Sequence, residues 1–266
     1  MQAFLTIAVR AARKAGDYIV RESDKIRTVE SKSANDYVTN VDENAERLII
    51  DTISHSYANH AFIGEESGHT GESDYEWIID PIDGTTNFIR KVPHWAISIA
   101  CRYKGRTEVA VVYDPLKEEL FTAVRGRGAQ FNGKRIRVSN TKGLEHSLLA
   151  TGFPFRSESK LTQYLDIFAR LFPHCSDMRR AGSAALDLAY VAAGRFDGFW
   201  EFGLKDWDTA AGILLVTEAG GMVSDIHGNP NQLKSESILA ANPKAFKSML
   251  QIINNKSGSR SKALLD

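Results

Sequence analysis

Two carboxylates and two hydroxyls lie close together in one short segment, Asp80-Pro81-Ile82-Asp83-Gly84-Thr85-Thr86-Asn87-Phe88. Hard divalent cations such as magnesium prefer oxygen ligands of this kind. A helix beginning near Thr85 or Thr86 would leave the backbone N–H groups of Gly84 and Thr85 without helical partners, and its positive end would favour an anion. The segment therefore predicts a site for metal ions and phosphate.

The same residue pattern is also typical of a β-turn, and most Asp-Gly turns are solvent-exposed loops. Two other segments favour the functional interpretation. An apolar run at 61–63 ends in Gly64-Glu65-Glu66-Ser67, and an apolar helix opens with Asp206-Trp207-Asp208. Each places an acid where a regular element meets the surface.

The elements that must position these acids can be read from hydrophobic spacing. The run 77–79 predicts a buried strand, with Asp80 where it leaves the core; Pro81 and Gly84 end the extended run, so a turn can fold Asp83 back beside Asp80. Upstream, residues 39–42 have capping-box spacing before a helix. Asp42 then falls in a first helical turn, where it either caps the helix or takes part in a site.

The remaining pattern mixes helices and strands. Helices are expected at 4–20, 161–171, 184–193 and 244–254, and strands at 95–102, 108–113, 120–123, 147–151, 198–201 and 222–224. No linker is apparent, which predicts one α/β domain over residues 1–255, with two intimately packed halves. Residues 256–266 have the composition of a disordered tail.

Composition limits the class of protein. The chain has 266 residues, 43% of them hydrophobic and 25% charged, and its 33 Lys and Arg balance its 33 Asp and Glu. This balance argues against a strongly basic nucleic-acid binder. Cys101 and Cys175 are too few for a disulfide framework, and Cys101 is expected to be a packed thiol. With no secretory signal or membrane-spanning run, we expect a cytoplasmic protein with no membrane contact.

The three acidic segments, together with Gly182-Ser183-Ala184-Ala185 and Thr217-Glu218-Ala219-Gly220-Gly221, resemble the signatures of the inositol monophosphatase family in their usual order. The resemblance covers nearly the whole chain. Residues 8–16 and 150–155 are similar to the proteobacterial extragenic-suppressor branch of that family. The resemblance implies a layered α-β-α-β-α fold, a homodimer, and lithium-sensitive, magnesium-dependent hydrolysis of inositol 1-phosphate and related small phosphate monoesters by two-metal activation of water.

The resemblance also implies roles for individual residues. Glu65, Asp80 and the carbonyl of Ile82 would hold one magnesium, and Asp80, Asp83 and Asp208 a second. Glu65 and Thr85 would help to deprotonate the attacking water, with Asp42 orienting the threonine hydroxyl. The substrate contacts implied are Asp83, Gly84, Thr85, Gly182, Ser183, Ala184, Glu201 and Asp208. Arg179 is either a further contact or a surface arginine, and the same choice holds for Arg180.

Two alternatives stay open. A bisphosphate phosphatase of the same superfamily would share the metal ligands. Members of the bacterial branch also serve as non-catalytic components of ribosomal RNA transcription antitermination and ribosome biogenesis, bound to transcription elongation factors and RNA polymerase. The basic runs at 125–128 and 134–137 are either local contacts for such a role or ordinary solvated faces.

Overall fold

The computed structural model describes residues 1–23, 29–33, 36–155, 158–230 and 235–255. The predicted disordered tail therefore lies outside the described residues. Among those that are described, no helix is long and apolar enough to cross a membrane. The helices are α1 (Gln2–Glu22), α2 (Asn40–Ser54), α3 (Thr85–Ile89), α4 (Leu161–Leu171), α5 (Ala184–Ala192), α6 (Asp206–Glu218) and α7 (Pro243–Asn254).

The strands form three sheets within the described residues. A two-stranded ribbon pairs β1 (Val29–Ser33) with β2 (Asp36–Thr39). The eight-stranded sheet has the order β10 (Lys134–Arg135), β9 (Gly128–Phe131), β8 (Glu119–Val124), β7 (Arg106–Asp114), β6 (Ala96–Tyr103), β5 (Tyr75–Asp83), β3 (Ala61–Gly64) and β4 (Gly68–Thr70). The five-stranded sheet has the order β12 (Asp177–Arg179), β11 (Leu148–Thr151), β13 (Gly198–Phe202), β15 (Ser237–Ala241) and β14 (Met222–Ser224).

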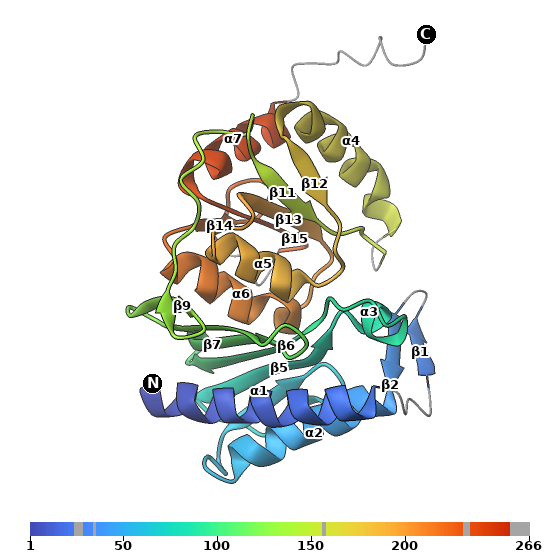
Figure 1. The fold of residues 1–266 in the computed structure, drawn as a ribbon, viewed down its shortest axis with the longest axis vertical. Helices are drawn as coiled ribbons and strands as arrows, with labels where there is room; N and C mark the ends of the chain where they lie inside the picture. Colours follow the sequence, from blue (N-terminus) through green and yellow to red (C-terminus); the bar gives the residue numbers. More distant parts are fainter. Residues whose placement is uncertain (24–28, 34–35, 156–157, 231–234, 256–266) are drawn as a thin grey trace.

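The two large sheets alternate with three layers of helices (Figure 1). Helices α1 and α2 cover the outer face of the eight-stranded sheet, α5 and α6 lie between the sheets, and α4 and α7 cover the five-stranded sheet. Both faces of the eight-stranded sheet are covered because successive residues of β5 enter different cores. Trp77 and Ile79 enter the core under α1, whereas Ile78 enters the core under α5 and α6. The expected α-β-α-β-α fold is confirmed.

The central helices α5 and α6 are apolar on most sides because both of their faces are buried. Alanines such as Ala185, Ala189 and Ala211 are fully buried there. Gly212 has no room for a side chain, since a Cβ atom would lie 2.5 Å from Leu188. Small residues thus let α5 and α6 pack closely enough for α6 to present its first turn to the end of β5.

The sequence reading of β5 was wrong in one respect. The strand does not end near Ile79 in a turn but continues to Asp83. Its pairing with β6 is irregular between Asp80, opposite Ser98, and Asp83, opposite Ala96, so three steps on β5 match two on β6. In a regular strand, residues three apart point to opposite faces. The extra residue of this bulge brings both carboxylates to the same side.

Most expected elements are present, and the helix predicted at 161–171 has the observed bounds of α4. The elements that the sequence did not predict are mainly short or peripheral strands, namely β1, β2, β4, β9, β10 and β12. The central strand β15 was also left out, although Ile238-Leu239-Ala240-Ala241 is a continuous apolar run of the type that a buried strand favours. Cys101 is a fully buried thiol, as expected.

Candidate active site

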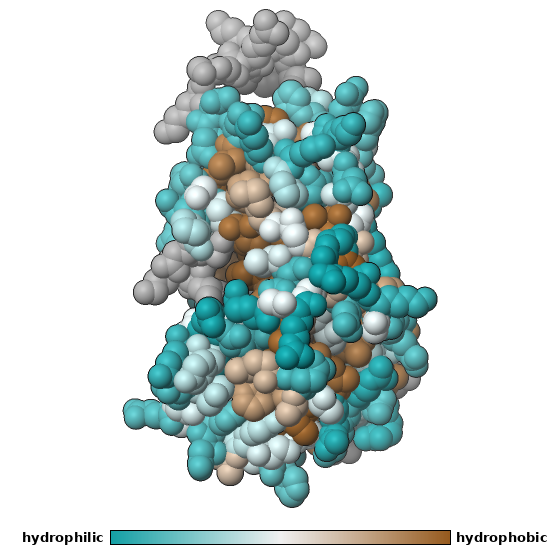
Figure 2. All heavy atoms as spheres, turned by 90° about the vertical axis from the view of Figure 1, so that its left-hand side faces the viewer, coloured by the Kyte–Doolittle hydropathy of each residue, from teal (hydrophilic) through white to brown (hydrophobic). Residues whose placement is uncertain are grey.

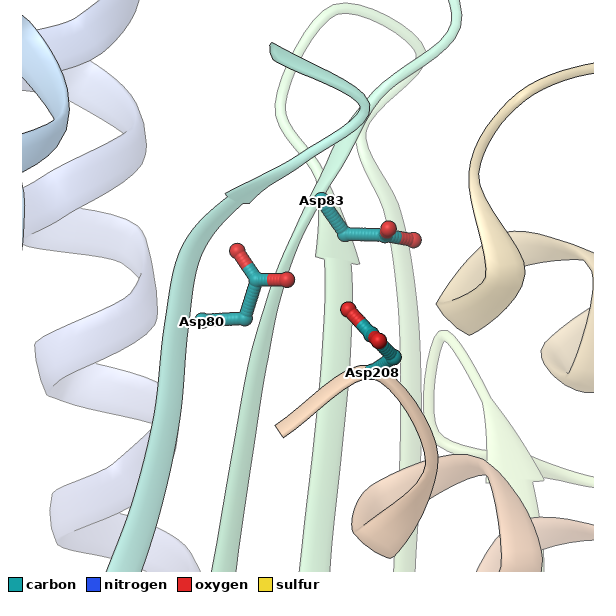
Figure 3. A group of neighbouring side chains, drawn as sticks. All are labelled: Asp80, Asp83 and Asp208. Carbon is teal, nitrogen blue, oxygen red and sulfur yellow. The ribbon is translucent and has the colours of Figure 1, made fainter. Parts of the chain in front are cut away.

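Three buried carboxylates converge where β5 meets the start of α6. Asp80 and Asp83 come from β5 and Asp208 from the first turn of α6, and one oxygen of each lies within 4.8 Å of the others. Figure 3 shows the three side chains pointing toward one another. All three residues are at most 8% exposed. Like charges this close and this buried need compensation by cations or protons.

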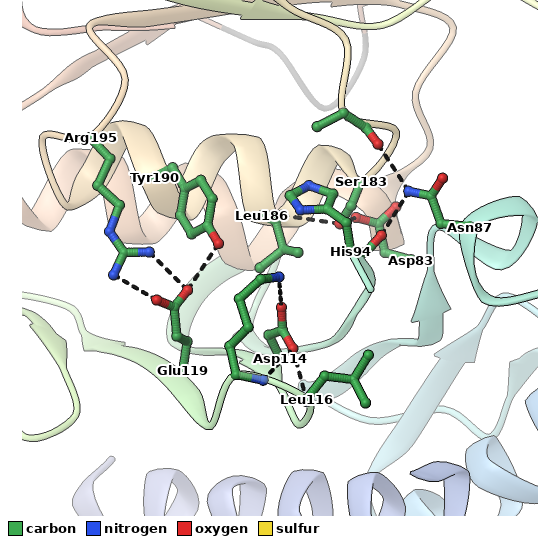
Figure 4. Close-up of polar contacts among 12 residues, drawn as sticks. Asp83, Asn87, His94, Asp114, Leu116, Glu119, Ser183, Leu186, Tyr190 and Arg195 are labelled. Atoms are coloured by element: carbon green, nitrogen blue, oxygen red, sulfur yellow. Dashed lines mark hydrogen bonds and ion pairs between the residues drawn. The ribbon is translucent and has the colours of Figure 1, made fainter. Parts of the chain in front are cut away.

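Hydrogen bonds fix the orientation of each carboxylate. The N–H of Ile82 donates to Asp80 Oδ1 at 2.9 Å, and the N–H of Lys205 donates to Asp208 Oδ2 at 2.6 Å. Asp83 Oδ2 accepts the hydroxyl of Ser183 at 2.5 Å and the N–H of Ala185 at 2.7 Å. These last two bonds join the eight-stranded sheet to α5, and Figure 4 shows Ser183 beside Asp83.

Burial and mutual repulsion change the acidity of the cluster. Burial, and then the charge of Asp208, raises the pKa of Asp83 to about 7. Burial also raises the pKa of Asp80 well above its usual range, with further contributions from Glu65, Asp83 and Asp208. The cluster without cations therefore retains protons at a pH where exposed carboxyls have lost them.

Glu65 reaches the cluster from the neighbouring strand. Strand β3 runs parallel to β5, so the ends of both strands lie at the same edge, and the Glu65 N–H donates to the carbonyl of Ile79 at 3.1 Å. The buried Glu46 on α2 fixes the next two residues by accepting the N–H groups of Glu66 at 2.9 Å and Ser67 at 2.8 Å. The sequence did not predict a role for Glu46. The feature that could have indicated one is an acid on the apolar face of a predicted helix.

Thr85 lies between two oxygen atoms. Its hydroxyl is 3.2 Å from Asp42 Oδ1 and 3.1 Å from the carbonyl oxygen of Ile82. Asp42 also caps α2, because its other oxygen accepts the N–H of Thr39 at 2.9 Å and the Thr39 hydroxyl at 2.5 Å. Asp42 therefore caps α2 and also contacts the Thr85 hydroxyl, and its part in the chemistry stays a prediction. Burial raises the pKa of Asp42 to about 6, against the lowering effect of the Thr39 bonds.

Helix α3 begins next to the carboxylates. Gly84 precedes it with φ 101°, a left-handed conformation that favours glycine, and no side chain caps the helix. A Cβ atom on Gly84 would lie 3.1 Å from the carbonyl oxygen of Gly182. The first N–H groups of the helix are thus available to an anion.

A cavity opens between these groups and the end of α5. Its lining includes Glu65, Asp80, Ile82, Asp83, Gly84, Thr85, Gly182, Ser183, Ala184, Glu201 and Asp208, all named from the sequence. It also includes Asn87, Thr151, Gly152 and Asp187, which sequence reasoning did not single out for the site. Gly152 leaves room for Glu201, since a Cβ atom there would collide with the Glu201 carboxylate.

The two arginines differ in position. Arg179 is exposed, pairs with Asp177 and is not among the described residues that line the cavity. Arg180 does line the cavity, and its guanidinium lies 5.0 Å from the ring centroid of Phe153. Strand β12, which ends at Arg179, directs successive side chains to opposite faces. Of the two alternatives left open for Arg179, the structure favours a surface arginine, and Arg180 is the arginine next to the cavity.

The sequence is similar to curated proteins over nearly its whole length. Curated relatives named "Nus factor SuhB" are 58% identical over 254 residues in Salmonella typhimurium, with 94% of this chain and 95% of the relative covered, and 55% identical over 261 residues in Pseudomonas aeruginosa, with 95% and 96% covered.

Solved structures show the same fold. The extragenic suppressor protein suhB from Bartonella henselae is 41% identical with a TM-score of 0.92, covering 96% of this chain and 99% of that one. An inositol monophosphatase from Anabaena is 37% identical with a TM-score of 0.86, covering 95% of each chain. The sequence model of the inositol monophosphatase family matches residues 1–257. The chain therefore belongs to the inositol monophosphatase family.

Proposed function

We propose that this protein is a magnesium-dependent phosphatase that hydrolyses inositol 1-phosphate and related small phosphate monoesters. The observation that carries the proposal is the convergence of Asp80, Asp83 and Asp208 beside the N-terminus of α3. The carboxylates would bind cations and the N-terminus of α3 would bind an anion. A phosphate ester with its metal ions needs both.

The residues present fit magnesium. The donor set consists of carboxylate oxygens and a backbone carbonyl. The pKa values of Asp80 and Asp83 are raised first by burial and then by repulsion among the carboxylates, which cations would relieve. Glu65, Asp80 and the Ile82 carbonyl would hold one ion, and Asp80, Asp83 and Asp208 a second. When bound, the ions would make water easier to deprotonate and would neutralise charge on the phosphoryl group and the leaving oxygen.

The protein's own residues would orient water and move its proton. The Thr85 hydroxyl can donate to Asp42 or to the Ile82 carbonyl, which leaves an oxygen lone pair to accept a hydrogen bond from water. Glu65, on the same cavity wall, would take the proton. The N–H groups of Gly84 and Thr85 would hold the phosphate oxygens, while Arg180, Gly182, Ser183, Ala184 and Glu201 would face the leaving group.

The test is phosphate release from inositol 1-phosphate, with magnesium and after its removal with a chelator. Wild type should turn over only with magnesium, and Asp83→Asn should lose at least about 100-fold in kcat/KM because it alters a metal ligand. Asp74→Asn is the control, since Asp74 is a surface carboxylate paired with Lys104. Turnover that is independent of magnesium, or unchanged in Asp83→Asn, would refute the proposal.

A second role in ribosomal RNA transcription antitermination is a separate proposal, supported by the relatives named Nus factor. The two basic runs lie together, because β10 pairs with β9. The Arg135 guanidinium also lies against Gly128, since a Cβ atom added to that glycine would be only 3.2 Å from it. Strand β9 lies at the left of Figure 1, and strongly hydrophilic side chains gather near mid-height on the face that Figure 2 shows. This role would require RNA polymerase and elongation factors as partners, in the cytoplasm.

The two roles can be separated by matched variants. Reversing the exposed Lys134 and Arg135 to Glu should weaken binding to RNA polymerase–elongation factor complexes and leave phosphate release unchanged. Asp83→Asn should do the opposite. If the charge reversals leave binding at wild-type strength, this surface does not contact the transcription complex.

A further inference from the structure

Asp187 is a buried carboxyl in the first turn of α5 that also lines the cavity. The residue is 1% exposed and lines the cavity, and its Oδ1 has no hydrogen-bond partner among the described residues. Leaving such a group unpaired destabilises the fold. Buried polar groups in proteins are normally hydrogen-bonded, so an unpaired one in a cavity wall indicates that a ligand completes it.

Helix α5 places Asp187 on the leaving-group side of the cavity. Ser183, Ala184 and Asp187 all line the cavity, and their spacing puts them on one helix face. Ser183 bonds the metal-site residue Asp83. Asp187 lies about one turn further along α5, a rise of roughly 6 Å from Ser183.

The charges that face Asp187 define what it can bind. Besides burial, Glu201 and Asp83 raise its pKa, and Arg180 lowers it. Arg180 forms no ion pair with it within the part of the chain that the structure describes. Thr151, on the same wall, has a buried hydroxyl next to the hydroxyl of Tyr164. With Arg180, this wall holds one cation, two acids and a hydroxyl. Its acceptor oxygens suit a neutral group rich in O–H donors, and its excess of negative charge disfavours a second phosphate.

We infer that Asp187 is a specificity-determining residue, which hydrogen-bonds a hydroxyl of a neutral polyol leaving group and so selects polyol monophosphates over bisphosphates and over hydroxyl-free esters. This inference rests on the proposed phosphatase function and adds the chemistry by which the same site chooses its substrate.

The test compares two esters in two variants. In Asp187→Leu, kcat/KM for inositol 1-phosphate should fall about 10–100-fold, as for loss of a hydrogen bond to a charged group. For phenyl phosphate, whose leaving group has no other hydroxyl, it should change less than about threefold. Asp187→Asn keeps one accepting oxygen and should retain more of the polyol preference than Asp187→Leu.

Asp197→Asn is the matched control, because Asp197 is a buried carboxylate outside the cavity with both oxygens bonded, to the hydroxyl of Ser139 at 2.5 Å and to the N–H of Leu148 at 2.8 Å. It should lower Tm without changing the ratio of the two esters. Asp187→Leu should instead keep or raise Tm, since it removes an unpaired polar group. Equal losses on both esters, or no loss on either, would overturn the inference.

Failure of the phosphatase proposal gives a different result. If wild type hydrolyses neither ester, the proposed function fails. The role of Asp187 is then decided by the binding of free inositol, measured by calorimetry in the presence of magnesium and phosphate. Wild type should then bind at least tenfold more tightly than Asp187→Leu. Equal binding, or no binding by wild type, would overturn the inference.

Discussion

At the scale of single residues, the site depends on carboxylates that the folded protein keeps under electrostatic strain. Asp80, Asp83 and Asp208 are buried beside one another, and each is oriented by a backbone N–H. Replacing one of them should therefore weaken metal binding and strengthen the metal-free fold. Such opposite effects distinguish a binding site from a structural carboxylate.

Asp83→Asn should make the metal-free protein more stable at high pH. The pKa of Asp83 is about 7 in the folded state and 3.8 ordinarily, so its contribution to stability is fully present below pH 3.8 and is lost as pH rises toward 7. With a chelator, the variant should melt roughly 5 °C above wild type at pH 8, and the difference should shrink toward pH 5. An Asn oxygen can still accept the Ser183 and Ala185 bonds.

Calorimetry across this pH range checks the prediction, and saturating magnesium should reverse the order at pH 8 because only wild type has the full ligand set. If Asp83→Asn melts below wild type at every pH without metal, the carboxylate stabilises the fold and the repulsion described here is absent.

At the scale of elements, the bulge in β5 and the short helix α3 position the site. Asn87 on α3 links them to the loop before α5: its amide donates to the carbonyl oxygens of His94 at 2.7 Å and Ala181 at 2.9 Å (Figure 4). Gly84 and Gly182 approach closely beside this link. The amide thus holds the anion-binding end of α3 against the wall that carries Ser183.

Asn87→Asp should lower kcat/KM at least tenfold, because a carboxylate would face two carbonyl oxygens and could not donate to them. A lost buried bond should also lower Tm by a few degrees. Asn44→Asp is the control, since Asn44 donates to a carbonyl within α2, away from the cavity. Steady-state kinetics at saturating magnesium check the prediction, and wild-type kinetics in Asn87→Asp would contradict it.

The sequence predicted local features better than features made by distant segments. The carboxylates were recognisable because an acid follows an apolar run at Asp80 and opens an apolar run at Asp208. The bulge was not, since a Pro-x-Asp-Gly pattern fits a turn equally well. Glu46, Asn87 and Asp187 matter only through contacts with residues far along the chain or through the cavity that they line, and single-sequence periodicity does not report such contacts.

At the scale of the whole molecule, the eight-stranded sheet meets the central helices α5 and α6 at the cavity, and one side chain connects the sheet to α5 at a distance from it. Glu119 on β8 accepts the hydroxyl of Tyr190 at 2.9 Å and pairs with Arg195 at 2.7 Å (Figure 4). Asp80 and Asp83 come from the eight-stranded sheet and Asp208 from the central helix α6, so the site requires the complete fold.

We further propose that the protein is a homodimer joined through α4. This helix buries Tyr164, Ile167 and Leu171 on one face, yet Leu161 is 48% and Leu165 53% exposed on the other. Apolar side chains on both faces of a surface helix indicate a second partner. Leu165→Glu should give a monomer in sedimentation, whereas Val20→Glu, at an exposed position on α1, should not. A monomeric wild type, or a Leu165→Glu dimer, would contradict this.

The central claim is that the three carboxylates hold metal ions where a phosphate ester is cleaved. The most direct measurement is anomalous diffraction from crystals grown with manganese, as a magnesium substitute, and phosphate. The account predicts metal peaks bonded to Asp80, Asp83 and Asp208, with phosphate against the N–H groups of Gly84 and Thr85. Crystals at saturating manganese with no peak among these carboxylates, or with phosphate bound elsewhere, would contradict it.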